Sequence, residues 1–133
     1  KVAAVNVKNI LGNADIQIME SDLFNVFEKN RQWDIILSNP PYIPLKYKST
    51  LQREVLSEPA MALFGGDDGL KLIKRIIKEA KYHLSDNGFL LFEADISQKN
   101  AIQRLSEAYG YGKVEIINDL TMRPRFALLK RSS

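Results

Sequence analysis

Residues 33–42, which read WDIILSNPPY, indicate the fold of this chain most clearly. The run Trp33–Leu37 is short and almost continuously apolar, as is typical of a strand that is buried on both faces of a parallel sheet. Asn39-Pro40-Pro41-Tyr42 follows directly, at the carboxyl end of that strand, where open α/β sheets bind their ligands. The sequence therefore predicts a central strand that ends in a ligand-binding loop.

Other apolar runs alternate with helical patterns, which is typical of crossover units and predicts an α/β fold with a mostly parallel sheet. Further strands are expected at Ile16–Met19, Phe89–Phe92, Val114–Ile117 and Phe126–Leu129. Phe89–Phe92 is expected to be a second central strand, and the last two to pair antiparallel because their connection is short. Helices are expected over residues 1–10, 70–84 and 98–108, the last with Ser97 as its N-cap.

The composition suits one soluble domain, residues 1–133, with 45% hydrophobic and 26% charged residues. Zero cysteines exclude a disulfide scaffold, a zinc finger and a thiol nucleophile, and no metal site is expected. Since no run is long enough to span a membrane, the expected compartment is the cytoplasm, or alternatively an organelle matrix. The net charge of +3 is mild, so its excess, including the basic residues near the end of the chain, is expected to be solvated surface. Those basic residues are Arg123, Arg125, Lys130 and Arg131.

The loop Asn39–Tyr42 has the residue types needed to act on a planar NH2 group. Such a nitrogen is a poor nucleophile because its lone pair is delocalised. The Asn39 side-chain oxygen and the backbone carbonyls beside Pro40 and Pro41 could accept both of its hydrogens, and the prolines add no competing N–H. Tyr42 offers a flat face for stacking. The alternative is a proline turn with Tyr42 packed at its rim.

Asn39-Pro40-Pro41-Tyr42 resembles the signature of methyltransferases that modify planar NH2 nitrogens, and the flanking residues resemble the HemK family of release-factor glutamine N5-methyltransferases. The resemblance runs from Ser21-Asp22-Leu23-Phe24 to Asp119-Leu120 and Arg125. It includes Tyr42-Ile43-Pro44, Glu54-Val55, Glu58-Pro59, Ala62-Leu63, Gly65-Gly66, Asp68-Gly69-Leu70 and Arg75-Ile76-Ile77. The chain departs from the family at Glu93-Ala94-Asp95, where the family has Glu-Ile-Gly before its glutamine, here Gln98, and at Thr121-Met122.

The resemblance implies a Rossmann-like class I S-adenosylmethionine-dependent methyltransferase fold. It implies that Asp22 and Leu23 lie against the adenine of the cofactor, Asp22 as an acceptor for its amino group. The substrate glutamine amide would be held by Asn39, Pro40, Pro41 and Tyr42, with Asn39, Pro40 and Tyr42 as the catalytic residues. Asn39 would also lie near the methionine part of S-adenosylmethionine. The implied substrate is the Gly-Gly-Gln motif of a peptide-chain release factor, and positioning, without a general base, would suffice for transfer.

A cofactor-binding glycine-rich turn is missing, since Gly12 is the only glycine before Gly65. The expectation is therefore that the chain is the carboxyl-terminal portion of a catalytic domain and lacks the first two strands. In the family's order those strands lie between the strands at Ile16 and Trp33. Their loss would expose two edges, so the chain alone is expected to fold poorly or to need a partner. A cooperative two-state thermal transition would contradict this expectation.

Two other functions remain open from the sequence. An adenine-N6 methyltransferase of DNA or RNA needs the same loop, together with a surface for a flipped base. A catalytically inactive binding module would keep the loop without the cofactor half.

Other polar residues have simpler explanations. His83 is expected to interact with a helix carboxyl end, residues 65–69 to form a turn, and Glu54 and Glu58 to be surface carboxylates. The cations of Lys46, Lys48 and Arg53 are expected to help dock a macromolecular substrate.

Overall fold

The computed structural model describes residues 2–12, 15–52 and 57–132. Its elements in chain order are α1 (Val2–Asn6), the π-helical turn η1 (Val7–Leu11), β1 (Trp33–Ser38), the 3-10 helix η2 (Leu45–Thr50), α3 (Ala60–Leu63), α4 (Lys71–His83), β2 (Leu84–Glu93), the 3-10 helix η3 (Ile96–Gln98), α5 (Lys99–Ala108), β3 (Glu115–Asn118) and β4 (Pro124–Lys130). Within these ranges no helix is both long enough and apolar enough to cross a bilayer.

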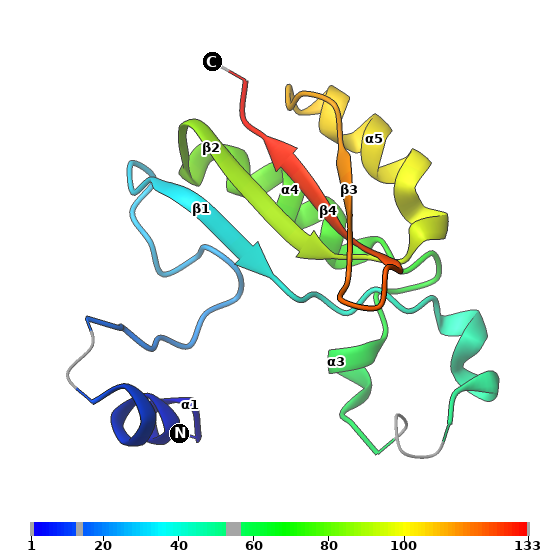
Figure 1. The fold of residues 1–133 in the computed structure, drawn as a ribbon, viewed down its shortest axis with the longest axis horizontal. Coiled ribbons are helices and arrows are strands. Elements are labelled where there is room, and N and C mark those ends of the chain that lie inside the picture. Colours follow the sequence, from blue (N-terminus) through cyan, green and yellow to red (C-terminus); the bar gives the residue numbers. More distant parts are fainter. Residues whose placement is uncertain (1, 13–14, 53–56, 133) are drawn as a thin grey trace.

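The strands form a sheet in the order β1-β2-β4-β3 (Figure 1). β1 and β2 are parallel, and β4 runs antiparallel to both β2 and β3, so the predicted crossover unit and final antiparallel pair are confirmed. Only one of these three pairs is parallel, so the prediction of a mostly parallel sheet is wrong for the described strands. In the parallel pair Ser38 lies opposite Phe92. Asn39, which follows β1, and Glu93, the last residue of β2, therefore come at the same end of the parallel pair.

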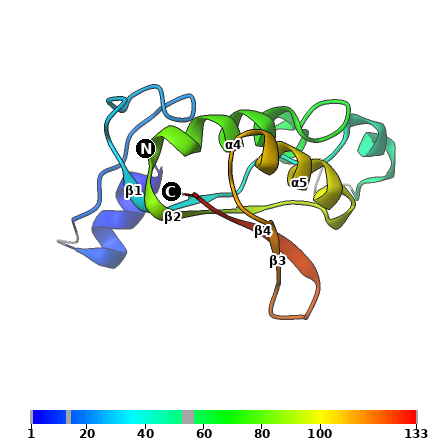
Figure 2. The same ribbon diagram turned by 90° about the horizontal axis from the view of Figure 1, so that it is seen from above.

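Helices α4 and α5 cover one face of this sheet (Figure 2). The predicted helix over residues 70–84 is confirmed as α4, whose side chains Ile73, Ile77 and Ala80 are completely buried. They recur at the spacing of one helical face and pack with Leu90 and other residues of β2 and β4. The helix-covered face is therefore the hydrophobic core.

The opposite face remains open at β1, contrary to the prediction that this strand is buried on both faces. Ile35 is 61% exposed and Leu37 is 70% exposed, and β1 is an edge strand of the described sheet. Strand side chains alternate, so Ile36 reaches the core while its two neighbours point the other way. The apolar run identified a strand correctly, but its outer face and free edge have no described partner.

The predicted strand at Ile16–Met19 is wrong, because residues 15–20 form no strand and are exposed. A strand requires a neighbour to pair its backbone N–H and C=O groups, and no strand of the described chain lies beside this segment. The helical prediction for residues 1–10 is confirmed by α1 and η1, which bury none of their described side chains.

The last helical region begins at Asp95 rather than at the predicted cap Ser97. The Asp95 carboxylate accepts a hydrogen bond from the Ser97 backbone N–H at 2.8 Å, and the Gln98 side chain accepts one from the Asp95 N–H at 3.1 Å. This reciprocal capping box satisfies two N–H groups at once, which a cap at Ser97 would not do.

The two faces of the sheet are expected to respond differently to truncation. Leu90→Ala should lower the free energy of unfolding by about 3 kcal/mol, because it leaves a cavity in the core. Leu37→Ala, on the open face, should cost less than about 1 kcal/mol. Urea unfolding followed by the fluorescence of Trp33 measures both, and equal losses would contradict this assignment of the core.

Candidate functional site

The loop Asn39–Tyr42 follows β1 as predicted, and Asn39 faces a hollow at the end of the sheet. The hollow has a volume of about 310 Å³ and is lined by Leu37, Ser38, Asn39, Leu91, Phe92 and Phe126. Within the described chain the Asn39 side chain makes no hydrogen bond, so its amide oxygen is free to accept one. The site therefore combines two polar side chains, those of Ser38 and Asn39, with apolar walls, which is typical of pockets that orient a small planar group.

Two glycines support this loop from behind. A Cβ atom built on Gly65 would lie 2.5 Å from the Pro41 carbonyl oxygen, and one on Gly69 would lie 2.1 Å from the Tyr42 carbonyl oxygen. Gly69 also has a φ of +73°, which favours glycine. The turn at residues 65–69 is confirmed, with the Asp68 carboxylate accepting from the Leu70 N–H at 2.9 Å. Its function in this structure is close backbone packing against the loop.

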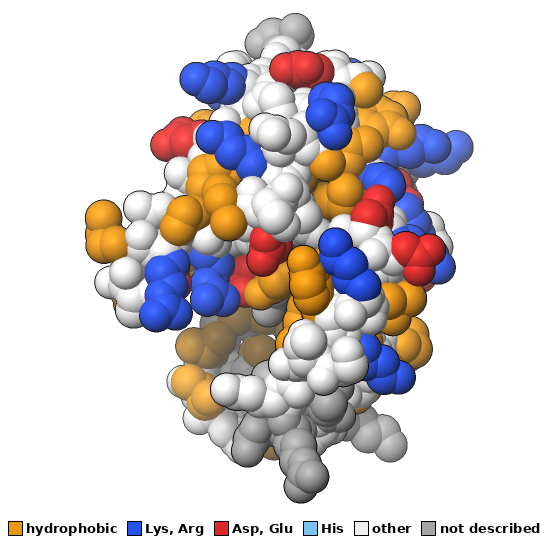
Figure 3. Space-filling view, turned by 90° about the vertical axis from the view of Figure 1, so that its right-hand side faces the viewer, with side chains coloured by type: hydrophobic (Ala, Val, Ile, Leu, Met, Phe, Trp, Pro, Cys, Tyr) orange, Lys and Arg blue, Asp and Glu red, His pale blue; other side chains and the backbone are white. Residues whose placement is uncertain are grey.

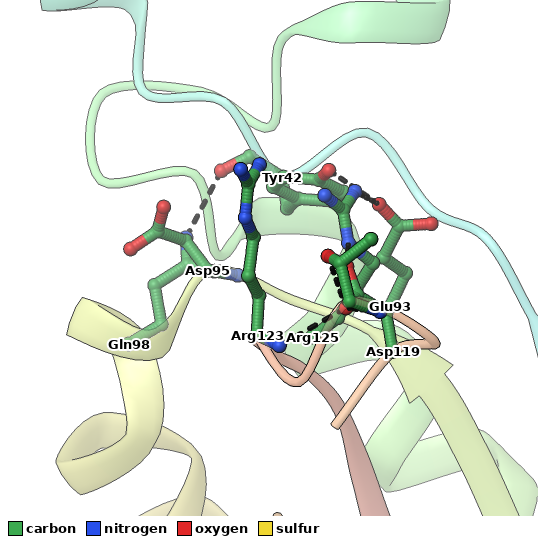
Figure 4. Close-up of polar contacts among 8 residues, drawn as sticks. Tyr42, Glu93, Asp95, Gln98, Asp119, Arg123 and Arg125 are labelled. Atoms are coloured by element: carbon green, nitrogen blue, oxygen red, sulfur yellow. Dashed lines mark hydrogen bonds and ion pairs between the residues drawn. The ribbon is translucent and has the colours of Figure 1, made fainter. Parts of the chain in front are cut away.

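The Tyr42 side chain is held by charged residues from the ends of two strands (Figure 4). Its hydroxyl donates to Glu93 Oε1 at 2.5 Å, and Arg125 Nη1 donates to the same oxygen at 2.9 Å. Burial, followed by the hydrogen bond to Glu93, raises the pKa of Tyr42 to about 12. Tyr42 is therefore a neutral phenol at physiological pH, suited to stacking and not to proton transfer.

The Tyr42 backbone is held separately by Gln98, which is only 5% exposed. Gln98 Nε2 donates to the Tyr42 carbonyl at 3.0 Å and to the Asp68 carbonyl at 3.2 Å. The Gln98 amide oxygen accepts from the Asp95 N–H, so both N–H groups and the oxygen of this side chain have hydrogen-bond partners. Gln98 therefore joins the substrate loop to the start of the last helical region.

Asp119 organises the turn between β3 and β4 beside this cluster. Its Oδ1 accepts from the Thr121 N–H at 2.8 Å, the Thr121 hydroxyl at 2.7 Å and the Arg123 N–H at 3.0 Å, and its Oδ2 accepts from Arg125 Nε at 3.2 Å. These donors lower the pKa of Asp119 from 3.8 to about 2, and the Arg123 N–H makes the largest contribution. The Thr121-Met122 departure from the family pattern thus forms an ordered turn, in which Met122 has a φ of +63°.

A pH dependence of stability follows from this lowered pKa. Because the folded state favours the charged carboxylate, its contribution is complete above pH 3.8 and is lost as the pH falls through about 2. Asp119→Asn should therefore lose less stability than the wild type across that interval. Urea unfolding of both proteins at several pH values measures the difference, and parallel pH profiles would contradict the role of Asp119.

Asp22 and Leu23 lie against α4 and not beside the loop Asn39–Tyr42. Arg75 donates from Nη1 and Nη2 to the two Asp22 oxygens at 3.0 and 3.1 Å. Leu23 packs against the core with a φ of +52°, so the two residues form a turn and do not follow a strand as predicted. No hydrogen bond within the described ranges joins Asp22 to Asn39 or Tyr42.

Sequence reasoning did not assign site roles to Glu93, Gln98, Arg125 or Arg75, although it noted all four in the family resemblance. The available signal was a polar residue directly after the apolar run of β2, at the edge where β1 also ends. The site roles of Gln98, Arg125 and Arg75 become visible only from their tertiary contacts.

His83 lies outside this site, and its predicted position at a helix carboxyl end is confirmed, since it is in the last turn of α4. Its Nδ1 lies 2.9 Å from the Arg31 carbonyl oxygen, and its ring stacks on Phe24 at 4.9 Å between centroids. Trp33 joins the same aromatic cluster, but it is only half-buried and lies outside the hydrophobic core. His83 is thus a structural residue that attaches the segment before β1 to α4.

Several charged residues are not gathered into one binding surface. Figure 3 shows cations interspersed with apolar and acidic side chains on the face that it presents. Arg125 pairs with Glu93 and Asp119, and Arg131 pairs with Asp86 at 3.5 Å. Lys46 and Lys48 are exposed on η2, and Glu58 is exposed as predicted, whereas Arg53 and Glu54 lie outside the described residues. In the described part of the chain, no three carboxylate or histidine side chains come together as a metal site.

Comparison with known proteins identifies the family. No protein-family model matches the chain. A release factor glutamine methyltransferase from Thermodesulfovibrio yellowstonii is 32% identical over 128 residues, covering 96% of this chain and 43% of the relative. A ribosomal protein uL3 glutamine methyltransferase from Francisella tularensis is 40% identical over 97 residues, covering 73% of this chain and 31% of the relative. This chain thus spans less than half the length of these two relatives.

A methyltransferase from Pyrococcus furiosus of known crystal structure has a TM-score of 0.63 to this chain. The match covers 98% of this chain and 56% of the other, at 21% sequence identity, and so concerns the fold. It confirms the predicted fold of S-adenosylmethionine-dependent methyltransferases. With relatives more than 30% identical over nearly all of its length and Asn39-Pro40-Pro41-Tyr42 at the end of β1, this chain belongs to the HemK family of glutamine methyltransferases.

Proposed function

We propose that this chain provides the substrate-holding part of an enzyme that methylates the side-chain nitrogen of a protein glutamine, with S-adenosylmethionine as the methyl donor. The observation that carries the proposal is the free Asn39 amide at the hollow beside β1, in the same loop as a Tyr42 ring held in place. The site contains polar acceptors and a flat ring but no activated nucleophile. Such a site is suited to orienting an amide rather than to attacking it.

The loop geometry indicates which acceptors are available to the glutamine NH2 group. The Tyr42 carbonyl is occupied by Gln98, and the Pro41 carbonyl lies against Gly65. Asn39 Oδ1, on an exposed side chain, would accept one amide hydrogen, and the carbonyl of the buried Pro40 is proposed as the second acceptor. Held in this way, the nitrogen would lose part of its amide resonance and turn its lone pair toward the methyl donor.

The cofactor supplies an electrophilic methyl group on a sulfonium, so the chain needs no general base before transfer. Asp22 fits the role of adenine acceptor in part: each oxygen holds one donor from Arg75 and keeps a second lone pair, and the side chain is 61% exposed. Leu23 would lie beneath the adenine, and Asn39 near the methionine part. The chain lacks a glycine-rich turn ahead of Asn39 that could hold the rest of the cofactor.

We propose a peptide-chain release factor as the macromolecular substrate, with the glutamine of a Gly-Gly-Gln motif as the target. The relative from Thermodesulfovibrio yellowstonii, aligned over 96% of this chain, supports this choice. The second candidate is ribosomal protein uL3, supported by the relative from Francisella tularensis that is 40% identical. The exposed cations Lys46 and Lys48 would assist docking of either protein.

Two measurements test the proposal. Calorimetric titration with S-adenosylmethionine tests whether the cofactor site is complete in this chain: saturable 1:1 binding that Asp22→Ala abolishes would contradict the expectation that the first two strands are missing. Mass spectrometry should then detect one added methyl group on the release-factor glutamine after incubation with chain and cofactor, and none with Asn39→Ala. Methylation of uL3 alone would select the second candidate, and methylation of an adenine in DNA or RNA would overturn the glutamine assignment. Absence of cofactor binding would mean that the activity belongs to a longer protein, to which this chain contributes only the substrate-holding part.

A further inference from the structure

Glu93 occupies a central position among the contacts of Tyr42. One of its oxygens, Oε1, receives both the Tyr42 hydroxyl at 2.5 Å and Arg125 Nη1 at 2.9 Å (Figure 4). The Glu93 side chain is only 17% exposed, so these hydrogen bonds are sheltered from water. Glu93 is the last residue of β2, a strand whose backbone pairs on both sides. The carboxylate is thus attached to a rigid part of the fold.

Arg125 fixes the direction of the Glu93 carboxylate. Its Nη1 contacts Glu93 while its Nε contacts Asp119 Oδ2 at 3.2 Å, so the guanidinium bridges two acids. Asp119 is itself held by three hydrogen bonds from the turn that follows it. A planar guanidinium bound at two points has little freedom to rotate, and it restrains the oxygen that receives the Tyr42 hydroxyl.

Tyr42 is consequently held at both ends. Glu93 holds the hydroxyl at the tip of the ring, and Gln98 holds the backbone carbonyl of the same residue at 3.0 Å. A ring that is fixed at its base and its tip presents its face in one orientation. If the substrate amide stacks on this ring, a small tilt would misplace the nitrogen, and misplacement by about 1 Å can cost 100-fold in rate.

We infer that Glu93, restrained by Arg125, is a positioning residue of the glutamine subsite that sets the orientation of the Tyr42 ring. The inference rests on the proposed function and deepens it, because Glu93 touches neither the amide nor the methyl group. It acts on the reaction through Tyr42 alone. The alternative is that the same cluster only stabilises the turn between β3 and β4.

A set of variants separates the two roles. Glu93→Ala and Tyr42→Phe each remove the hydroxyl contact and should each lower kcat for glutamine methylation about tenfold or more, with the Kd for S-adenosylmethionine unchanged. The double variant should be no slower than the slower single variant, because both changes remove the same contact. Glu93→Gln, which can still accept from the hydroxyl, should restore part of the rate. Glu115→Ala, an exposed glutamate on β3, is the matched control and should retain wild-type kcat.

A spectroscopic measurement reads the contact without any activity. Carbon-13 labelling of the five tyrosines, with the Tyr42 signal assigned from Tyr42→Phe, follows the ionisation of each phenol by NMR. Burial, the largest cause of the raised pKa of Tyr42, about 12, remains in Glu93→Ala. That pKa should nevertheless fall part of the way toward 10, because the hydrogen bond to Glu93 and its negative charge are removed. The Tyr42 pKa should be unchanged in Glu115→Ala.

The outcomes distinguish this inference from the proposed function. If the wild type methylates glutamine and Glu93→Ala has the same kcat, the positioning role is overturned while the proposed function stands. Losses of kcat that multiply in the double variant would also overturn it, since they would show that Glu93 and Tyr42 act separately. Absence of glutamine methylation by the wild type would overturn the proposed function and the positioning role with it, while the NMR titration would still report whether Glu93 holds Tyr42.

Discussion

Gly69→Ala is expected to cause the largest loss of stability of any single methyl addition to this chain. The added Cβ would lie 2.1 Å from the Tyr42 carbonyl oxygen and 2.5 Å from Gln98 Nε2, well inside van der Waals contact. The backbone there has a φ of +73°, which alanine adopts only with strain. Overlap and strain together should lower the free energy of unfolding by about 3 kcal/mol or more.

The matched control for this substitution is Gly112→Ala, where a Cβ would meet no atom within 4 Å. Its effect should lie within about 1 kcal/mol of zero. Urea unfolding monitored by Trp33 fluorescence measures both variants. A stable Gly69→Ala protein would mean that the turn at residues 65–69 does not pack closely against the substrate loop.

Asn39→Ala is expected to abolish nearly all glutamine methylation under the proposed function. The Asn39 side chain is a free polar group at the hollow beside β1, and its removal would leave the substrate amide with one acceptor instead of two. Loss of a single orienting polar contact of this kind costs about 100-fold to 1000-fold in rate. The free energy of unfolding should change little, because Asn39 is exposed and makes no internal hydrogen bond.

Methyl transfer to the release-factor glutamine, quantified by mass spectrometry at several substrate concentrations, gives kcat/KM for this variant. Asn6→Ala, an exposed asparagine in α1, serves as the control and should match the wild type. If kcat/KM for Asn39→Ala stays within a few-fold of the wild type, the amide is held elsewhere and the assignment of Asn39 is wrong.

The comparison of sequence with structure shows which features local patterns can reveal. The run Trp33–Leu37 identified a strand because a short, almost continuously apolar run is a local property of the chain. The apolar residues of Ile16–Met19 were misleading, since a strand also requires a neighbour, and no local pattern reports whether one is present. The prediction of Ser97 as the cap of the last helical region was wrong for a related reason. Ser97 is a good cap by residue type, but Asp95 together with Gln98 satisfies more N–H groups.

The site shows the same division. Asn39-Pro40-Pro41-Tyr42 could be recognised from the sequence because four adjacent residues carry its chemistry. The residues that hold Tyr42 could not be assigned in this way, since Glu93 and Arg125 lie 51 and 83 positions after it in the chain. The pairing of Asp22 with Arg75 is similarly distant.

The sequence by itself thus determined the fold class, the family and the location of the substrate loop, because these depend on periodicity and on contiguous motifs. Only the tertiary structure decided that β1 has an open face and that Gly65 and Gly69 pack behind the loop. It also decided that Tyr42 is fixed by Glu93 and Gln98. The physical reason is that ion pairs, close backbone contacts and burial depend on which distant segments meet, and the register of the parallel pair β1–β2 brings these segments together.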